Sequence, residues 1–322
     1  MCGIFGLVRA LECRHPRVAS EAFVSLGRLA EERGRDAAGF ALVSGGHDGP
    51  AGSAGRAIHQ RYVELDGCTV VKAPTTFSRV WQRRYLSQLD AAPIAVGHSR
   101  WATRGSPDAV ANASPMVVGR LIGTHNGDVD DGELLHRYQL GRRQGGTDTE
   151  VRFGALEHAG ADPKEIAAVL SAVVGRAALA WMDRGQADRV HLARAALSPL
   201  AIARDREGNF YWASNPRWFR VLDIKGRFGF RDVAMVREGS YLTVVGGVMP
   251  RGDVERRFQA HARPRDAFAV AAVWRGFDSD DMHLDQARCT HRVAPSDTGR
   301  RRRGPARHRR AKPAGAKSRK GR

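Results

Sequence analysis

The residue with the clearest chemical potential is Cys2, which follows directly after Met1. Because the side chain of cysteine is small, we expect Met1 to be removed, which creates a free α-amine on the residue that carries the thiol. An α-amine has a pKa of about 8, so part of it is unprotonated at neutral pH and can accept the thiol proton. Cys2 then holds a nucleophile and its base. The alternative is a small apolar residue at the start of a buried strand.

Five short segments resemble one enzyme family, and they occur in the family's order. The chain opens with Cys-Gly-Ile-Phe-Gly at 2–6, and Arg-Gly-Arg-Asp-Ala-Ala-Gly follows at 33–39. Further segments are Gly-His-Ser-Arg-Trp-Ala-Thr-Arg-Gly at 97–105, His-Asn-Gly at 125–127 and Thr-Asp-Thr-Glu at 147–150. Together they resemble the class II glutamine amidotransferases, which are N-terminal-nucleophile hydrolases.

The resemblance is strongest to the glutaminase half of the glucosamine-6-phosphate synthases and covers residues 2–247. It implies an α+β fold, a four-layer αββα sandwich of the N-terminal-nucleophile type. It also implies hydrolysis of L-glutamine to L-glutamate and ammonia through a glutamyl thioester on Cys2, without a metal or organic cofactor. Because the sugar-isomerase half is longer than the rest of this chain, we expect a separate synthase chain to receive the ammonia.

Glutamine is a zwitterion, so its two charged ends require partners of opposite charge. A planar guanidinium suits a carboxylate, and the resemblance assigns this role to Arg100. The α-ammonium group is assigned to Asp148, whose alternative role is a cap at a helix N-terminus. Trp101 and Thr103 belong to the loop after Arg100, which in the family folds over bound glutamine. The alternatives are a surface role for Arg100 and a core role for Trp101.

Attack on the amide carbon places negative charge on its oxygen, which preorganised donors must meet. The resemblance assigns this role to the side-chain amide of Asn126 and the backbone N–H of Gly127. Their alternative is a tight turn between strands. Arg33 resembles the family arginine that supports the surroundings of the nucleophile, and a cation at a helix end is its alternative.

Two positions near the glutamine loop depart from the family's pattern. Arg104 stands where the synthases usually have histidine. Ser114 lies in the segment 112–115, which is Asn-Ala-Ser-Pro here and Asn-Ala-His-Pro in the family. Loop closure and signalling to a partner domain are the steps that these changes would affect.

Apolar patterns predict the elements that position these residues. Strands are predicted over 3–8, 40–43, 94–98, 116–124, 177–182, 190–193, 200–204, 210–213 and 240–245. Helices are predicted over 19–32, 77–89, 148–158 and 163–174. Strands at both ends with helices between them predict packed sheets that are covered by helices.

The positive charge is concentrated at the end of the chain. The 322 residues carry a formal charge of +18, and residues 291–322 contain thirteen Lys or Arg and one acid. After a short extension, 248–293, whose structure the sequence leaves open, a disordered basic tail is predicted over 294–322. Such a tail neutralises phosphates with little sequence specificity, so nucleic acid is one candidate partner. A solubilising tail is the alternative.

Neither a membrane span, which needs about 20 apolar residues, nor a signal peptide is expected. The four cysteines show no metal or redox spacing, which favours free thiols in the cytoplasm. His283, Cys289 and His291 match no standard metal spacing, so we expect solvated side chains there and no metal.

Two rival functions stay open. A hydrolase of another γ-glutamyl or amide compound could use the same cysteine, because Arg100 and Asp148 select the head group but not the leaving group. A catalytically silent binding protein, whose basic tail contacts nucleic acid or an acidic partner, is the other rival. Retention of Met1 would favour the silent protein, since it blocks the α-amine of Cys2.

Overall fold

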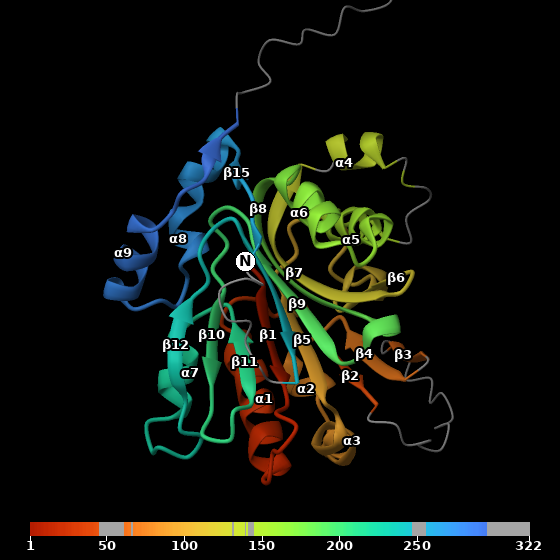
Figure 1. The fold of residues 1–322 in the computed structure, drawn as a ribbon, viewed down its shortest axis with the longest axis vertical. Helices are drawn as coiled ribbons and strands as arrows, with labels where there is room; N and C mark the ends of the chain where they lie inside the picture. Colours follow the sequence, from red (N-terminus) through yellow and green to blue (C-terminus); the bar gives the residue numbers. More distant parts are fainter. Residues whose placement is uncertain are drawn as a thin grey trace, which may run out of the picture.

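Two β-sheets lie face to face in the computed structural model (Figure 1), which describes residues 1–44, 61–65, 67–130, 132–138, 140, 145–246 and 256–294. The first sheet has the strands β1 (Gly3–Val8), β2 (Ala37–Val43), β3 (Arg61–Leu65), β4 (Cys68–Ala73), β5 (Ile94–Arg100), β10 (Ala201–Arg204), β11 (Phe210–Ala213) and β12 (Arg231–Met235). Their order is β12-β10-β11-β1-β5-β2-β4-β3. β1 therefore lies near the centre, antiparallel to both β5 and β11.

The second sheet has the strands β6 (Met116–Val118), β7 (Leu121–Asp130), β8 (Val174–Asp183), β9 (Arg189–Arg194), β13 (Ser240–Val245), β14 (Arg256–Arg257), β15 (His261–Ala262) and β16 (Arg292–Val293). Its order is β14-β13-β9-β8-β15-β16, and the hairpin β6–β7 joins it by antiparallel pairing of β7 with β8. The long β7–β8 pair places the predicted segment 125–127 within the sheet.

Helices lie outside the two sheets (Figure 1). They are α1 (Pro16–Ala30), α2 (Phe77–Val80), α3 (Leu86–Ala91), α4 (Gly132–Arg137), α5 (Asp148–Ala159), α6 (Pro163–Ser171), α7 (Arg217–Leu222), α8 (Val270–Val273) and α9 (Ser279–Ala287), with short 3-10 turns at Arg83–Tyr85, Val110–Asn112, Arg184–Gln186 and Pro264–Ala269. Across the described residues, each helix is too short or too polar to cross a lipid bilayer.

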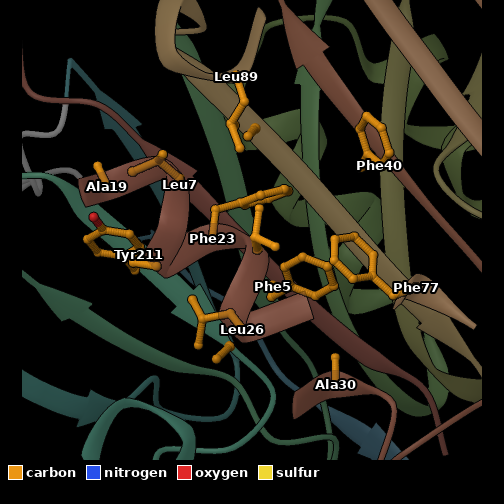
Figure 2. Close-up of a cluster of buried hydrophobic side chains, with 14 of the residues drawn as sticks. Phe5, Leu7, Ala19, Phe23, Leu26, Ala30, Phe40, Phe77, Leu89 and Tyr211 are labelled. Carbon is orange, nitrogen blue, oxygen red and sulfur yellow. The ribbon is translucent and has the colours of Figure 1, made fainter. Parts of the chain in front are cut away.

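Buried apolar clusters between the layers confirm the predicted αββα order. On the outer face of the first sheet, Phe5 of β1 packs on Phe23 of α1 and on Phe77 of α2, with ring centroids 5.1 and 5.2 Å away (Figure 2). Because side chains alternate along a strand, Ile4 points the other way, into the cluster between the sheets. A third cluster, which includes Phe153, packs α5 and α6 on the second sheet.

Two predicted elements are wrong in detail. The helix predicted over 77–89 is broken by extended backbone at Trp81 and Gln82. The break lets Trp81 and Tyr85 both pack on Phe40, each with ring centroids 5.2 Å away. The strand predicted over 116–124 is a hairpin, β6–β7, whose turn contains Gly119 with a φ of +52°. Tertiary packing and turn chemistry thus override the apolar pattern.

The segment 256–294 folds back onto the second sheet, where β14 pairs with β13 and β15 pairs with β8. In Figure 1 this segment, coloured blue, lies beside the label of the N-terminus. Residues 247–255 and 295–322 lie outside the described residues, and so does the predicted tail apart from Ala294. The sequence left the structure of residues 248–293 open, and residues 256–294 form an ordered part of the domain.

Candidate active site

A pocket opens at the N-terminal end of β1, where Cys2 precedes the strand. It is lined by Cys2, His98, Arg100, Trp101, Thr103, Arg104, Asn112, Ser114, His125, Gly127, Thr147, Asp148 and Thr149. Six of the eight predicted site residues are therefore brought together. The other two, Asn126 and Arg33, are fully buried and do not line it.

Cys2 is held by backbone contacts from both sides. Its thiol donates to the carbonyl of Trp101 at 3.6 Å, and its own carbonyl accepts from Nε of Arg33 at 3.0 Å. Burial is the main cause that raises the pKa of the thiol, while the nearby terminal ammonium acts in the opposite direction. Met1 is present and buried, and its sulfur contacts the guanidinium of Arg176 at 2.6 Å.

The segment 33–39 supports both the nucleophile and the loop. Burial lowers the pKa of Arg33 to about 10, and its other two nitrogens donate to the carbonyls of Arg275 and Val273 at 2.9 and 3.0 Å. A Cβ on Gly34 would lie 2.3 Å from the carbonyl carbon of Arg100, so only glycine allows this approach. Asp36, which had no predicted role, accepts from the backbone N–H of Ala102 at 2.7 Å.

Arg100 ends β5 and is buried, so the surface-arginine alternative is wrong. Its guanidinium donates to the carbonyls of Arg104 at 2.5 Å and Ser106 at 3.3 Å, which folds the following loop around it. Trp101 is 45% exposed, so the core-tryptophan alternative is wrong as well. Thr103 is exposed and lines the pocket from the same loop.

The two departures from the family pattern both lie at the pocket. Nε of Arg104 lies 3.4 Å from the carboxylate of Asp128. Ser114 is buried and lines the pocket. Two positions before it, the side chain of Asn112 donates to the carbonyl of Ser106 and accepts from Gly146, both at 3.0 Å. This amide therefore connects the loop to the segment that leads into α5.

Asn126 and Gly127 lie inside β7, paired with Ala178 and Ala177 of β8, so the tight-turn alternative is wrong. The side-chain amide of Asn126 is buried, and neither its nitrogen nor its oxygen has a hydrogen-bond partner among the described residues. A buried amide without partners is costly, which points to a functional reason for it. A Cβ on Gly127 would lie 1.8 Å from the carbonyl oxygen of Arg176, so the close β7–β8 approach requires glycine.

Asp148 is the first residue of α5, and Thr147 occupies the cap position, so the helix-cap alternative is wrong. Its carboxylate accepts from the backbone N–H of Val129 at 3.1 Å and lies 2.7 Å from the guanidinium of Arg152. Burial alone would raise the pKa of Asp148. The opposing effects of Arg152 and the Val129 N–H prevail and lower it to about 2. The carboxylate is therefore charged at neutral pH.

Sequence reasoning missed the residues behind Asp148. Arg152 is 1% exposed and contacts Nδ1 of His125 at 3.3 Å, while Thr149 contacts the same nitrogen at 3.2 Å. Burial is the main cause that lowers the pKa of His125 to about 3, and it does the same for His98, so both rings are neutral. The i,i+4 spacing of Asp148 and Arg152 was the available signal for their pairing.

One group in the described residues has metal-binding residue types, namely Glu238, Cys289 and His291. The expectation of solvated side chains is wrong for Cys289 and His291, which are partly buried around the buried carboxylate of Glu238. That carboxylate accepts from the backbone N–H groups of Leu197 and Thr290, both at 2.6 Å, and of His291 at 2.9 Å. Its oxygens thus connect residues 290 and 291 to Leu197.

Comparisons with known proteins agree with this geometry. Residues 98–220 match the family model of a glutamine amidotransferase domain. Glutamine–fructose-6-phosphate aminotransferase (isomerizing) of Caulobacter vibrioides is 33% identical over 251 residues, which cover 76% of this chain and 35% of that protein. The enzyme with the same name from Pyrobaculum aerophilum is 32% identical over 258 residues, which cover 77% of this chain and 37% of that protein. The chain thus spans about a third of the length of these relatives.

Solved structures show the same fold. Glutamine phosphoribosylpyrophosphate amidotransferase from B. subtilis, complexed with ADP and GMP, aligns with a TM-score of 0.56 and 21% identity over 82% of this chain and 52% of that chain. A structure described as the allosteric regulatory enzyme of purine biosynthesis aligns with a TM-score of 0.58 and 21% identity, over 82% and 51% of the two chains. This chain therefore contains a class II glutamine amidotransferase domain with the N-terminal-nucleophile fold.

Proposed function

We propose that this chain hydrolyses L-glutamine to L-glutamate and ammonia, with Cys2 as the nucleophile and its own α-amine as the base once Met1 is removed. One observation carries the proposal: Cys2, Arg100 and Asp148 line the same pocket. A free amino-acid head group needs the cation and the anion, and the amide needs the thiol. Trp101 and Thr103 line the pocket from the loop that would close over the substrate.

The reaction then proceeds as acyl transfer. The sulfur of Cys2 attacks the amide carbon, the thiol proton moves to the α-amine, and the oxyanion accepts hydrogen bonds from the side-chain nitrogen of Asn126 and the N–H of Gly127. The intermediate collapses, the C–N bond breaks, and ammonia leaves with the proton from the α-amine. Water then hydrolyses the glutamyl thioester, which releases glutamate and restores the thiol. Arg33 fixes the carbonyl of Cys2 throughout.

Removal of Met1 must precede folding of this region. The Met1 side chain is 9% exposed and packs among Leu197, Ala260 and Trp274. An aminopeptidase cannot reach such a residue in the folded chain. The proposal therefore includes removal of Met1 from the nascent chain, before residues 256–294 fold over it.

The ammonia acceptor is the second part of the proposal. The relatives are named for transfer to fructose 6-phosphate, but this chain spans only 35 and 37% of their length. We propose residues 2–247 as the glutaminase unit and a separate synthase or amidotransferase chain in the cytoplasm as the acceptor. The tail 294–322 stays a candidate contact for nucleic acid, because its charge suits phosphates.

Three measurements on the purified full chain test the glutaminase. Intact mass is expected to show loss of Met1. Glutamate release from glutamine is expected for the wild type and for Cys13→Ala, and is expected to be lost in Cys2→Ala. 6-Diazo-5-oxo-norleucine is expected to label Cys2 alone among the four cysteines. Retained Met1 together with no glutamate release would favour a silent binding protein. Release of ammonia from other γ-glutamyl amides but not from glutamine would favour the rival hydrolase.

A further inference from the structure

Residues 256–294 fold directly against the nucleophile and the glutamine loop. A buried ion pair holds this segment on the domain. Arg194 of β9 makes two hydrogen bonds, at 2.8 and 2.7 Å, to the carboxylate of Asp285 in α9. Nε1 of Trp274 donates to the same carboxylate at 2.9 Å. Because Arg194 and Asp285 are each about 2% exposed, the segment is a packed part of the domain.

The first contact with the site runs through Arg33. One guanidinium, fully buried, donates to the carbonyl of Cys2 and to the carbonyls of Val273 and Arg275. The segment therefore supplies two of the three acceptors that hold Arg33 in these contacts. A displaced segment would leave a buried cation short of partners, which is costly. The position of Cys2 thus depends on a segment more than 240 residues away in the sequence.

The second contact reaches the loop. The guanidinium of Arg275 lies over the ring of Trp101, 5.1 Å from its centroid. Trp101 is the first residue after β5, and its carbonyl accepts the hydrogen bond from the Cys2 thiol. Arg275 therefore contacts the loop at the residue that also touches the nucleophile.

The third contact connects the segment to β7 and to the other part of the loop. The buried guanidinium of Arg263 donates to both the backbone carbonyl and the carboxylate of Asp128, each at 2.8 Å. Asp128 directly follows Gly127, and its other carboxylate oxygen lies 3.4 Å from Arg104. Side chains of alternating charge thus connect the segment to the loop, past the proposed oxyanion residues. They are Arg263, Asp128 and Arg104.

We propose that residues 256–294 are a positioning element of the glutaminase, in which Arg275 and Arg263 hold the loop at 101–106 in the geometry that accepts glutamine. This rests on the proposed function for its effect on catalysis, but not for its effect on the loop. Arg104, which departs from the family pattern, is the loop residue that contacts Asp128 and, through it, Arg263. The segment lies on the surface of the domain, and it thereby connects that surface to the position of the loop.

Arg275→Ala tests the proposal, because Arg275 is exposed and its loss leaves the core intact. Arg288→Ala is the matched control, an exposed arginine at the end of α9 in the same segment. A cation–π contact at a partly exposed site corresponds to about two- to five-fold in an equilibrium. Arg275→Ala should therefore speed amide hydrogen exchange of residues 101–106 and lower kcat/KM for glutamine by that factor. Arg288→Ala should change neither, and Arg275→Lys should restore part of both.

Arg263→Lys is the second variant, since it keeps the charge but loses the paired hydrogen bonds to Asp128. It should increase exchange in both the loop and residues 127–129. The opposite outcome is a loop that exchanges at the same rate in Arg275→Ala, Arg263→Lys and Arg288→Ala, while the wild-type chain hydrolyses glutamine. That outcome would overturn the positioning role and leave the glutaminase intact. If the wild-type chain does not hydrolyse glutamine but Arg275→Ala and Arg263→Lys still exchange faster in the loop, the positioning role stands and the glutaminase is refuted.

Discussion

The guanidinium of Arg152 lies 2.7 Å from the carboxylate of Asp148, one helical turn along α5, and both side chains are buried. The proposed partner of the substrate ammonium group is therefore held in place by a cation of the protein. The substrate would approach Asp148 from the pocket, while Arg152 contacts it from the protein side and also contacts Nδ1 of His125. Arg152 keeps the carboxylate charged and fixes its orientation.

Replacement of Arg152 by Met should destabilise the fold and weaken glutamine binding together. Removal of one partner from a buried ion pair costs about 3–5 kcal/mol, because the other charge stays buried. The pKa of Asp148 should rise, since Arg152 is the main favourable charge that lowers it. Urea denaturation and KM for glutamine would measure the two effects.

The control for this variant is Arg189→Met. Arg189 pairs with Asp188 at 2.9 Å, but its side chain is 36% exposed and that of Asp188 is 55% exposed. Such a surface pair contributes about 0–1 kcal/mol. Equal losses of stability in the two variants would show that the Asp148–Arg152 pair contributes no more to stability than a surface pair does.

Asn126→Ala should lower kcat for glutamine by about 10²–10³-fold with little change in KM, which is the range for loss of one oxyanion donor. The reason is that the amide of Asn126 is buried without a partner among the described residues, so its nitrogen stays available for charge that develops in the transition state. Steady-state kinetics would check this. A large rise in KM with an unchanged kcat would place Asn126 in ground-state binding instead.

Short local patterns revealed the residues of the pocket, because each segment carries its own chemistry next to a strand or helix end. Cys2, Arg100, Gly127 and Asp148 were identified in this way, and they line one pocket. The layers followed from alternation of apolar residues, as in β1. Contacts between distant segments gave no local signal.

The contacts of Arg33 with Val273 and Arg275 span 240 and 242 positions, and no periodicity encodes them. The break at Trp81 arises from packing on Phe40, a residue of another element. The tight-turn alternative for Asn126 and Gly127 failed for a related reason. The Asn-Gly pattern favours a turn when it stands alone, but strand β8 pairs with this stretch along its whole length.

Gly127→Ala should destabilise the domain by about 1–3 kcal/mol, the cost of forcing an extra methyl into a packed site. The new Cβ would lie 1.8 Å from the carbonyl oxygen of Arg176, so β7 and β8 would have to separate. Glutaminase activity should fall further than stability does, because the N–H of Gly127 would move. Thermal unfolding and kcat/KM would be compared.

Gly132→Ala is the matched control for this substitution. Gly132 begins α4, and a Cβ placed there meets no described atom within 4 Å. Its effect on stability should stay within about 0.5 kcal/mol. A neutral Gly127→Ala variant with full activity would contradict both the packing account and the role of this N–H.

The pH dependence of kcat/KM should report the α-amine of Cys2. Burial, followed by the charges of Arg33, Arg176 and Arg275, lowers the pKa of the Met1 amine to about 6. Loss of Met1 places the amine on Cys2, whose carbonyl accepts from Arg33, so this cation and its neighbour Arg275 stay close to the amine. They disfavour the ammonium form, and the pKa should lie below the usual value of about 8. Since the base acts unprotonated, kcat/KM should rise with pH through this pKa and be lost as the pH falls below it.

The position of that acid limb separates the amine from other bases. Its midpoint should lie between about 6 and 8, and Arg275→Ala should move it upward, because one cation is removed from the surroundings of the amine. Arg288→Ala should leave the midpoint in place. The buried rings of His98 and His125 have pKa values of about 3, so they are neutral across this range and cannot produce the limb. A midpoint that stays fixed in Arg275→Ala, or that lies above 8, would argue that a group other than the α-amine accepts the proton of the Cys2 thiol.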